Sequence, residues 1–148
     1  MNRQFSFATR VCSGFFLIFL LTGVSAFAAE KDLKLEALLV LGSNDAQAKG
    51  TPVSPEIGKK LQRLPLKWSR YFVLDSQRFP LPKDGSKQVS LSRECQIAVT
   101  NLGGERVRLD LMGGGQNLGK VTQSLKKGQL LVVGGNAENT IVVLRQMD

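Results

Sequence analysis

Apolar and polar residues alternate along much of the chain after residue 32, as in β-strands that turn one face to solvent. Residues 33–41 begin with this alternation and become apolar on both faces from Leu38 onward. Strands that are apolar on both faces are typical of the interior of a sheet. We therefore predict a strand at 33–41 whose second half lies inside a sheet.

One segment has helical spacing instead. Residues 54–56 read Ser-Pro-Glu, which suits an N-cap, the first helical position and the positive end of the helix dipole. The apolar residues that follow recur one helical turn apart: Ile57, Leu61 and Leu64. Pro65 cannot continue the helix. We predict one short amphipathic helix of roughly ten residues, with this stripe docked on a sheet.

The rest of the chain is predicted to consist of short strands. They fall at 68–74, 88–91, 95–100, 107–111, 118–125, 129–133 and 140–144, with a turn-rich link at 79–85 and turns at 101–104 and 126–128. Short strands at close spacing with glycine turns are typical of antiparallel sandwiches and barrels. The predicted fold is mainly β, a small antiparallel β-sandwich or partly open barrel with one short amphipathic helix.

The first 28 residues have the features of a secretory signal peptide. Arg3 and Arg10 precede an apolar stretch at 15–21, and Ala26-Phe27-Ala28 fits a cleavage site. The stretch is too short for a membrane-spanning helix, which needs about 20 residues. We predict a cleaved signal peptide at 1–28 and a single exported domain at 29–148. That domain would be periplasmic or secreted, with no transmembrane span after cleavage.

The chain is basic. It has 20 lysines and arginines against 12 acidic residues, a formal charge of +8, and loss of Arg3 and Arg10 with the signal peptide leaves +6. A basic exported domain can attract anionic lipid, an acidic glycan or an acidic protein surface, whereas export makes nucleic acid an unexpected partner. The same charge could also serve only to keep the domain soluble.

Residue types that bind metals or perform catalysis are sparse. The chain has no histidine, and Cys95 alone would remain after cleavage, on an apolar strand face that predicts a buried side chain. We therefore expect no metal, cofactor or catalytic set. One enzymatic alternative stays open, a small envelope hydrolase in which the fold brings two carboxylates together. Asp75, Asp84 and Asp110 are the residues that could meet.

Residues 114–120 nearly match a phosphate-binding loop, G-x-x-x-x-G-K. The match lacks the Ser or Thr that would hold Mg²⁺, because Val121 follows the lysine. Residues 121–125 alternate as a strand does and do not predict the helix that such a loop must open. Ser124-x-x-Lys127 likewise matches a serine acyl-enzyme motif without a helix to carry it. We predict a glycine-rich connection between two antiparallel strands.

Basic and aromatic residues cluster on the predicted helix and just beyond it. The candidate binding residues are Lys59, Lys60, Arg63, Lys67, Trp68 and Arg70. The helical members lie off the apolar stripe and would face solvent. Basic side chains beside aromatic rings suit anionic lipid or carbohydrate. The alternative is an ordinary solvated helix face with Trp68 in the core.

Several turn and core segments carry a resemblance. These are Leu61–Leu64 before an aromatic strand, Leu91-Ser-x-x-Cys95, Asn101-Leu-Gly103, Gly128-x-Leu-Leu-Val-x-Gly-Gly and the final Ile-Val-Val-Leu-Arg strand. Together they resemble small exported bacterial β-domain proteins that have no assigned activity. The resemblance implies a secreted sandwich-like domain and transfers no catalytic residue. The stretch at 128–135 is also similar to β-hairpins of outer-membrane secretins, which favours envelope-assembly partners.

The favoured function is therefore a non-enzymatic exported β-domain that acts as a binding or structural module in the cell envelope. Its partner would be an envelope protein that adds a strand to an exposed sheet edge. The alternative partner is an anionic lipid or glycan held by the basic helix face.

Overall fold

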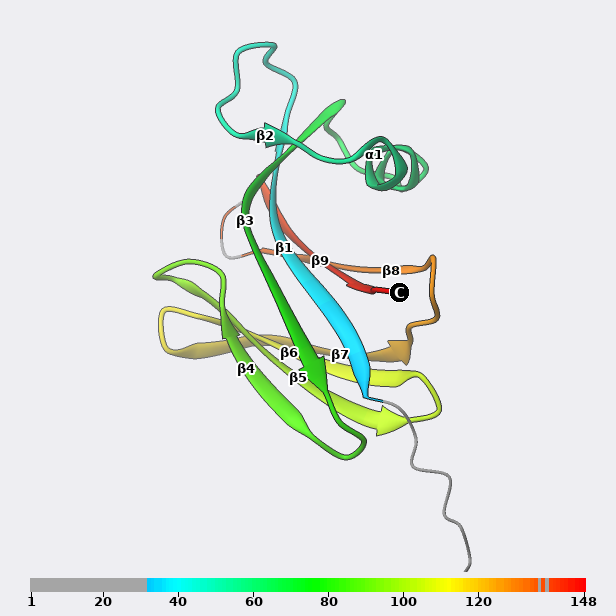
Figure 1. Cartoon of the computed structure of the whole chain (residues 1–148). Coiled ribbons are helices and arrows are strands. Elements are labelled where there is room, and N and C mark those ends of the chain that lie inside the picture. The colour runs from blue at the N-terminus through cyan, green and yellow to red at the C-terminus, as the bar shows by residue number, and fades with distance from the viewer. Residues whose placement is uncertain (1–31, 136, 138) are drawn as a thin grey trace, which may run out of the picture.

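The computed structural model describes residues 32–135, 137 and 139–148, which form nine strands and one helix (Figure 1). In chain order these are β1 (Leu33–Ser43), β2 (Thr51–Pro52), α1 (Pro55–Gln62), β3 (Arg70–Leu81), β4 (Ser86–Ser90), β5 (Cys95–Gly103), β6 (Arg106–Gly113), β7 (Gln116–Ser124), β8 (Leu130–Gly134) and β9 (Thr140–Gln146). The predicted signal peptide at 1–28 lies outside the described residues.

The strands form two antiparallel sheets. The first has the order β2-β3-β1-β9-β8 and the second the order β4-β5-β6-β7. The second sheet packs against the lower half of the long strands β1 and β3, and α1 lies across the upper end of the first sheet (Figure 1). The sheets do not close into a barrel, so the prediction of a mainly β, antiparallel sandwich-like fold is confirmed.

Strand β1 is buried on both faces, as its sequence predicts. Leu35, Ala37 and Leu39 face the second sheet and belong to the main core. Leu38 and Val40 face the other way, into a smaller apolar cluster covered by α1. Because β3 and β9 pair with β1 on either side, no edge of this strand meets solvent along the paired stretch.

Helix α1 begins where the sequence predicts. The Ser54 hydroxyl accepts a hydrogen bond from the Ile57 amide at 3.4 Å, and Ile57 and Leu61 are buried in the smaller cluster. The prediction for Leu64 is wrong, because the helix ends at Gln62 and the Leu64 side chain is 38% exposed. Leu64 therefore stands at the surface beside the helix and does not dock on the sheet.

The predicted link at 79–85 is wrong in its first half, because β3 continues to Leu81. Phe79 and Leu81 are buried in the main core, and Pro80 lies between them opposite Lys34. The Lys34 carbonyl accepts a hydrogen bond from the Met147 amide at 2.7 Å. The backbone N–H and C=O of Lys34 therefore point away from β3. Pro80 thus turns its nitrogen to the open edge, where no N–H is needed. The turn is confined to the residues after Leu81.

The near-match to a phosphate-binding loop is a β-hairpin. Gly114 and Gly115 form the turn between β6 and β7 with φ of 57° and 78°, conformations that favour glycine. Gly119, Lys120 and Val121 lie within β7, and the next element of the described chain is the strand β8. The predicted connection between two antiparallel strands is therefore confirmed. Ser124 ends that strand, so the S-x-x-K match is not helical either.

Candidate functional site

The four edge strands of the two sheets differ in their protection. An unprotected edge can pair with another chain, and proline or lysine on the edge commonly prevents this. Pro52 lies in β2, Lys87 in β4 and Lys120 in β7. Strand β8 reads Leu-Leu-Val-Val-Gly and carries neither proline nor charge. Strand β3 also lacks a neighbour on the β2 side beyond Val73, but that stretch contains Arg78 and Pro80. β8 is thus the edge most open to strand pairing.

The hydrogen-bonding pattern shows which β8 groups face outward. The Gly135 amide donates to the Thr140 carbonyl at 2.8 Å, which makes this pair a hydrogen-bonded one. Bonded pairs alternate along an antiparallel ladder. In the observed β8–β9 register, Leu130, Val132 and Gly134 therefore fall at the non-bonded positions. Their amides and carbonyls point away from β9, to the bare edge.

An apolar slot separates β8 from β7 on the core side of the molecule. It has a volume of about 320 Å³. Its lining includes Leu109, Leu111, Leu118, Gly119, Val121 and Val133. The slot exists because one core-facing position of β7 has no side chain to fill it: Gly119 lies opposite the buried Leu111. Leu118 at its mouth is 51% exposed.

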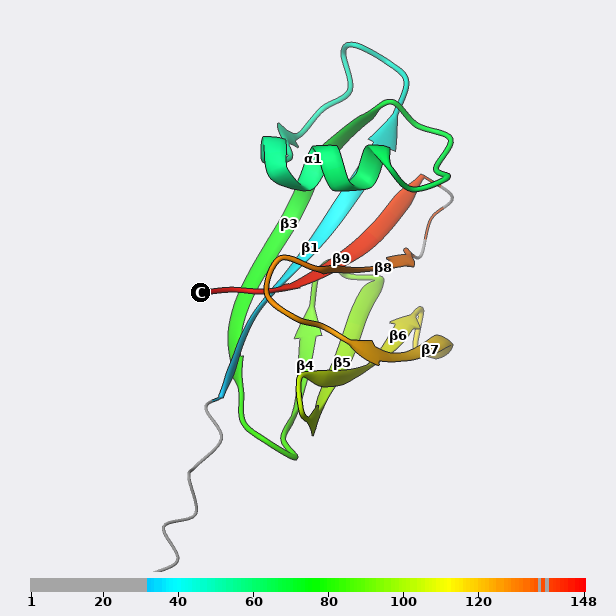
Figure 2. The same cartoon turned by 90° about the vertical axis from the view of Figure 1, so that its right-hand side faces the viewer.

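A basic groove lies on the opposite face of β8, between α1 and the β7–β8 connection. In Figure 2 the helix runs above β8 and β7 runs below it. The groove has a volume of about 580 Å³, with Leu64, Leu130 and Val132 as its apolar lining. Lys60, Arg63 and Lys126 line it as well, and no carboxylate of the described residues does. It therefore combines an apolar floor with positive charge.

Lys60 ties the helix to the β7–β8 connection. Its ammonium lies 2.9 Å from Glu56 Oε1 and donates a second hydrogen bond to the Gly128 carbonyl. The hydrogen bond and the charge of Lys60 hold the pKa of the Glu56 carboxyl below its usual range. These contacts fix the Lys60 charge at the rim of the groove.

The six predicted binding residues do not converge on one place. Lys60 and Arg63 line the basic groove, whereas Lys67, Trp68 and Arg70 lie outside its lining. Lys67 Nζ is 5.4 Å from the centre of the Trp68 ring, and an Arg70 guanidinium N–H donates to the Ala46 carbonyl at 3.4 Å. Lys59 is an exposed residue of the helix.

Trp68 packs as a structural residue. Its indole is half-buried in the smaller apolar cluster and lies directly on Gly42 of β1. A Cβ at position 42 would come within 2.3 Å of the ring. The sequence was compatible with either a core position or a binding role for Trp68, and the structure shows the core position.

Sequence reasoning missed Lys126 as a member of the groove. Lys126 follows Arg63 by more than sixty residues, and only the β7–β8 connection brings it to the helix. In the sequence, Lys126 and Lys127 before Gly128 indicated a turn, and no sequence pattern indicated that this turn lies beside α1. The apolar slot was equally invisible, since it depends on how the two sheets are packed.

The carboxylates considered for a hydrolase lie on separate elements. Asp75 belongs to β3, Asp84 to the turn after it, and Asp110 to β6. Asp110 lies 3.5 Å from both the Arg108 guanidinium and the Lys120 ammonium. Within the described part of the chain, no cluster of three metal-binding side chains occurs.

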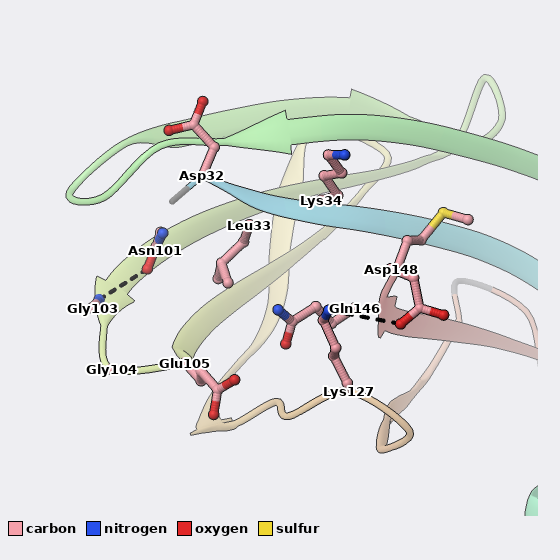
Figure 3. Close-up of a pocket in the computed structure, with 11 residues that line it drawn as sticks. Asp32, Leu33, Lys34, Asn101, Gly103, Gly104, Glu105, Lys127, Gln146 and Asp148 are labelled. Carbon is pink, nitrogen blue, oxygen red and sulfur yellow. Dashed lines mark hydrogen bonds and ion pairs between the residues drawn. The ribbon is translucent and has the colours of Figure 1, made fainter. Parts of the chain in front are cut away.

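Another pocket, of about 380 Å³, opens at the end of the molecule where β1 begins (Figure 3). Its carboxylates are Asp32, Glu105 and Asp148, which enter from different sides and do not face one another (Figure 3). Asp148 pairs with Lys127 at 3.7 Å. The Asn101 amide is used within the fold, where it donates to the Leu81 carbonyl at 3.1 Å. This pocket thus offers no converging set of groups.

The fold is an antiparallel two-sheet β-domain, and among the described edge strands β8 carries neither proline nor charge. No family model, curated protein or solved structure matches the chain. Among the described residues, no helix is both long and apolar enough to cross a membrane.

Proposed function

We propose that the domain is a non-enzymatic binding module of the cell envelope and that its protein partner adds an extended segment to the free edge of β8. The observation that carries this proposal is the bare, uncharged edge with outward-facing backbone groups at Leu130, Val132 and Gly134. Such an edge binds an extended segment through main-chain hydrogen bonds.

The energetics favour a partner at this edge. Each main-chain hydrogen bond to a bound strand contributes about 1 kcal/mol, so a few bonds alone give weak binding. The slot and the groove flanking β8 offer apolar surface that a bound strand would bury, at roughly 25 cal/mol per Å². The hydrogen bonds would set the register, and apolar burial would supply most of the affinity.

The location rests on the N-terminal pattern. A basic region, an apolar stretch and an A-x-A site precede the domain, and together they favour export into the periplasm or beyond. The resemblance to small exported β-domain proteins supports the same location.

The proposal is tested by removing one outward N–H. Val132→Pro deletes a donor at the bare edge and leaves the ladder to β9 in place, because proline is tolerated where the N–H faces outward. A photo-cross-linking residue at Gln129, beside the edge, should trap one discrete envelope protein in intact cells. Val132→Pro should reduce that adduct at least tenfold, as measured by blotting.

Gln88→Pro provides a matched control on β4. By the same alternation, counted from the Leu91 amide that donates to the Cys95 carbonyl, Gln88 also points its N–H outward. This variant should leave the adduct unchanged, and thermal denaturation should show both variants folded. An adduct that survives Val132→Pro, or no adduct at all, would contradict the proposal.

A second candidate function is binding of an anionic lipid or glycan, favoured by the basic groove with no carboxylate among its described lining residues. In this case the protein should bind vesicles containing phosphatidylglycerol, and added salt should weaken the binding steeply. Changing Lys60, Arg63 and Lys126 to Gln should abolish binding, whereas Gly134→Pro, which removes an outward N–H of β8 outside the groove lining, should not affect it.

A further inference from the structure

We infer that the segment bound at β8 is an extended peptide in which apolar and acidic residues alternate, with its apolar side chains in the slot and its carboxylates in the basic groove. This inference rests on the proposed function and specifies the partner's chemistry.

The alternation follows from the position of β8 between two unlike surfaces. Leu131 and Val133 face the main core and the slot, whereas Leu130 and Val132 face the helix and the groove. A strand added beside β8 directs successive side chains to these same two faces. Its odd and even positions therefore meet different chemistry, and five paired residues would span the whole of β8.

The slot selects apolar side chains of moderate size. Leu109, Leu111 and Val121 line it together with Val133, and its volume is about 320 Å³. An unpaired polar group placed there would lose its hydration without gaining a partner. Two valine or leucine side chains entering the slot would extend the main core towards the open side of the sandwich.

The groove selects carboxylates. Arg63 and Lys126 bring two positive charges to it and Lys60 brings a third that is paired with Glu56, and no acidic residue of the described chain lines the groove. Leu64 and Val132 form part of its floor. A glutamate fits this combination, because its methylene groups can cover the apolar floor while its carboxylate reaches the rim.

A second copy of this chain does not satisfy the same chemistry. Pairing β8 with another β8 would bring two grooves close together, each lined by Lys60, Arg63 and Lys126, and both copies carry a net positive charge. Like charges across an interface oppose association. The segment Leu-Leu-Val-Val-Gly also contains no acidic residue. The partner is therefore a different protein with an acidic-apolar segment.

The inference is tested with synthetic peptides of about nine residues, long enough to pair with all of β8. In one peptide valine and glutamate alternate, in a second lysine replaces glutamate, and in a third the first composition is rearranged without alternation. Isothermal titration calorimetry should show micromolar binding of the alternating glutamate peptide and at least tenfold weaker binding of the other two. Raising the salt to about 0.5 M should reduce this preference over the lysine peptide.

Two sets of variants separate the two faces. Gly119→Leu should fill the slot and weaken binding at least tenfold without lowering the melting temperature, since a Cβ at this position meets nothing within 4 Å. Gly119→Ala, which leaves most of the slot open, should bind within about twofold of wild type. Combined Gln substitutions at Lys60, Arg63 and Lys126 should also weaken binding at least tenfold.

A control with the same change in net charge uses exposed basic residues away from the groove. Changing Lys49, Lys87 and Arg93 to Gln should leave binding of the glutamate peptide unchanged at moderate salt, because none of them lines the groove. Equal loss in the two triple variants would show a nonspecific charge effect and overturn the inference.

The outcomes distinguish this inference from the proposed function. If the glutamate and lysine peptides bind equally and Val132→Pro abolishes both, the inferred chemistry is wrong while strand addition stands. If Val132→Pro leaves the binding of every peptide unchanged, both are overturned. A concentration-dependent dimer in sedimentation experiments that Val132→Pro removes would identify a second copy as the occupant and overturn the inference.

Discussion

At the scale of single residues, Glu36 is a buried carboxylate in a cross-strand cluster on β1. It is 3% exposed, and it accepts hydrogen bonds from Arg78 of β3 at 2.9 Å and from Arg145 of β9. Burial acts to raise the pKa of Glu36, but the hydrogen bonds and charges of Arg78 and Arg145 outweigh it and hold the pKa below the ordinary value. The ionised form therefore stabilises the fold.

Glu36→Gln should lower the free energy of unfolding at neutral pH by roughly 1–3 kcal/mol, because two charge-assisted hydrogen bonds are weakened. A carboxyl with a lowered folded-state pKa contributes stability above its unfolded value and loses it as the pH falls through the folded value. The difference in the free energy of unfolding between wild type and Glu36→Gln should therefore narrow as the pH falls below 4.5, the ordinary pKa of a glutamate. Urea denaturation at several pH values measures this.

Glu94→Gln serves as the control, because Glu94 lies in an exposed turn. The free energy of unfolding of Glu94→Gln should be close to that of wild type at neutral pH. A gap between wild type and Glu36→Gln that stays constant down to pH about 2 would contradict the assigned role of the carboxylate.

At the scale of elements, α1 stabilises the first sheet by covering one face of β1. Leu61 is 0% exposed and packs in the smaller cluster with Leu38 and Val40, whereas Leu64 is 38% exposed. Both leucines belong to one helical stripe in the sequence. Because the helix ends at Gln62, Leu61 is held against the sheet and Leu64 is not.

Leu61→Ala should lower the free energy of unfolding by about 2–5 kcal/mol, the usual cost of a cavity in a packed cluster. Leu64→Ala should cost less than about 1 kcal/mol, because its side chain is already partly solvated. Chemical denaturation of the two variants makes the comparison. Equal losses would show that Leu64 also docks on the sheet.

At the scale of the whole molecule, the first and last strands of the described chain lie side by side, while β4 to β7 form a separate sheet. β1 and β9 pair over residues 35–41 and 140–146 at the centre of the first sheet. β7 and β8 are edge strands on either side of the slot. The centre is therefore held by neighbours on both sides, and the proposed binding edge is not.

Hydrogen exchange should reflect this difference. Amides at Leu39 and Val142, which are buried in the main core, should exchange only through unfolding of the whole domain. The outward amides at Leu130, Val132 and Gly134 should exchange orders of magnitude faster. Nuclear magnetic resonance can follow each amide separately. Uniform slow exchange along β8 would show that the edge is already covered.

Local pattern alone determined much of this fold. Alternation predicted the positions of most strands, Ser54 and Pro55 marked the start of the helix, and glycines marked the hairpin turn at Gly114. These predictions succeeded because they depend on neighbours a few residues apart, where backbone geometry and side-chain periodicity decide the outcome. Pro80 was mistaken for part of a turn because its tolerance in a strand depends on which side of β3 is unpaired.

Only the tertiary structure decided the candidate site. The basic residues near α1 were visible in the sequence, but Lys126 joined two of them only when the β7–β8 connection passed beside the helix. The slot beside Gly119 and the bare edge of β8 result from strand order and sheet packing, which join residues far apart in the chain. The sequence pattern specifies which faces of each strand must be buried. The order in which the strands pair and the sheets pack decides which edges and gaps remain uncovered.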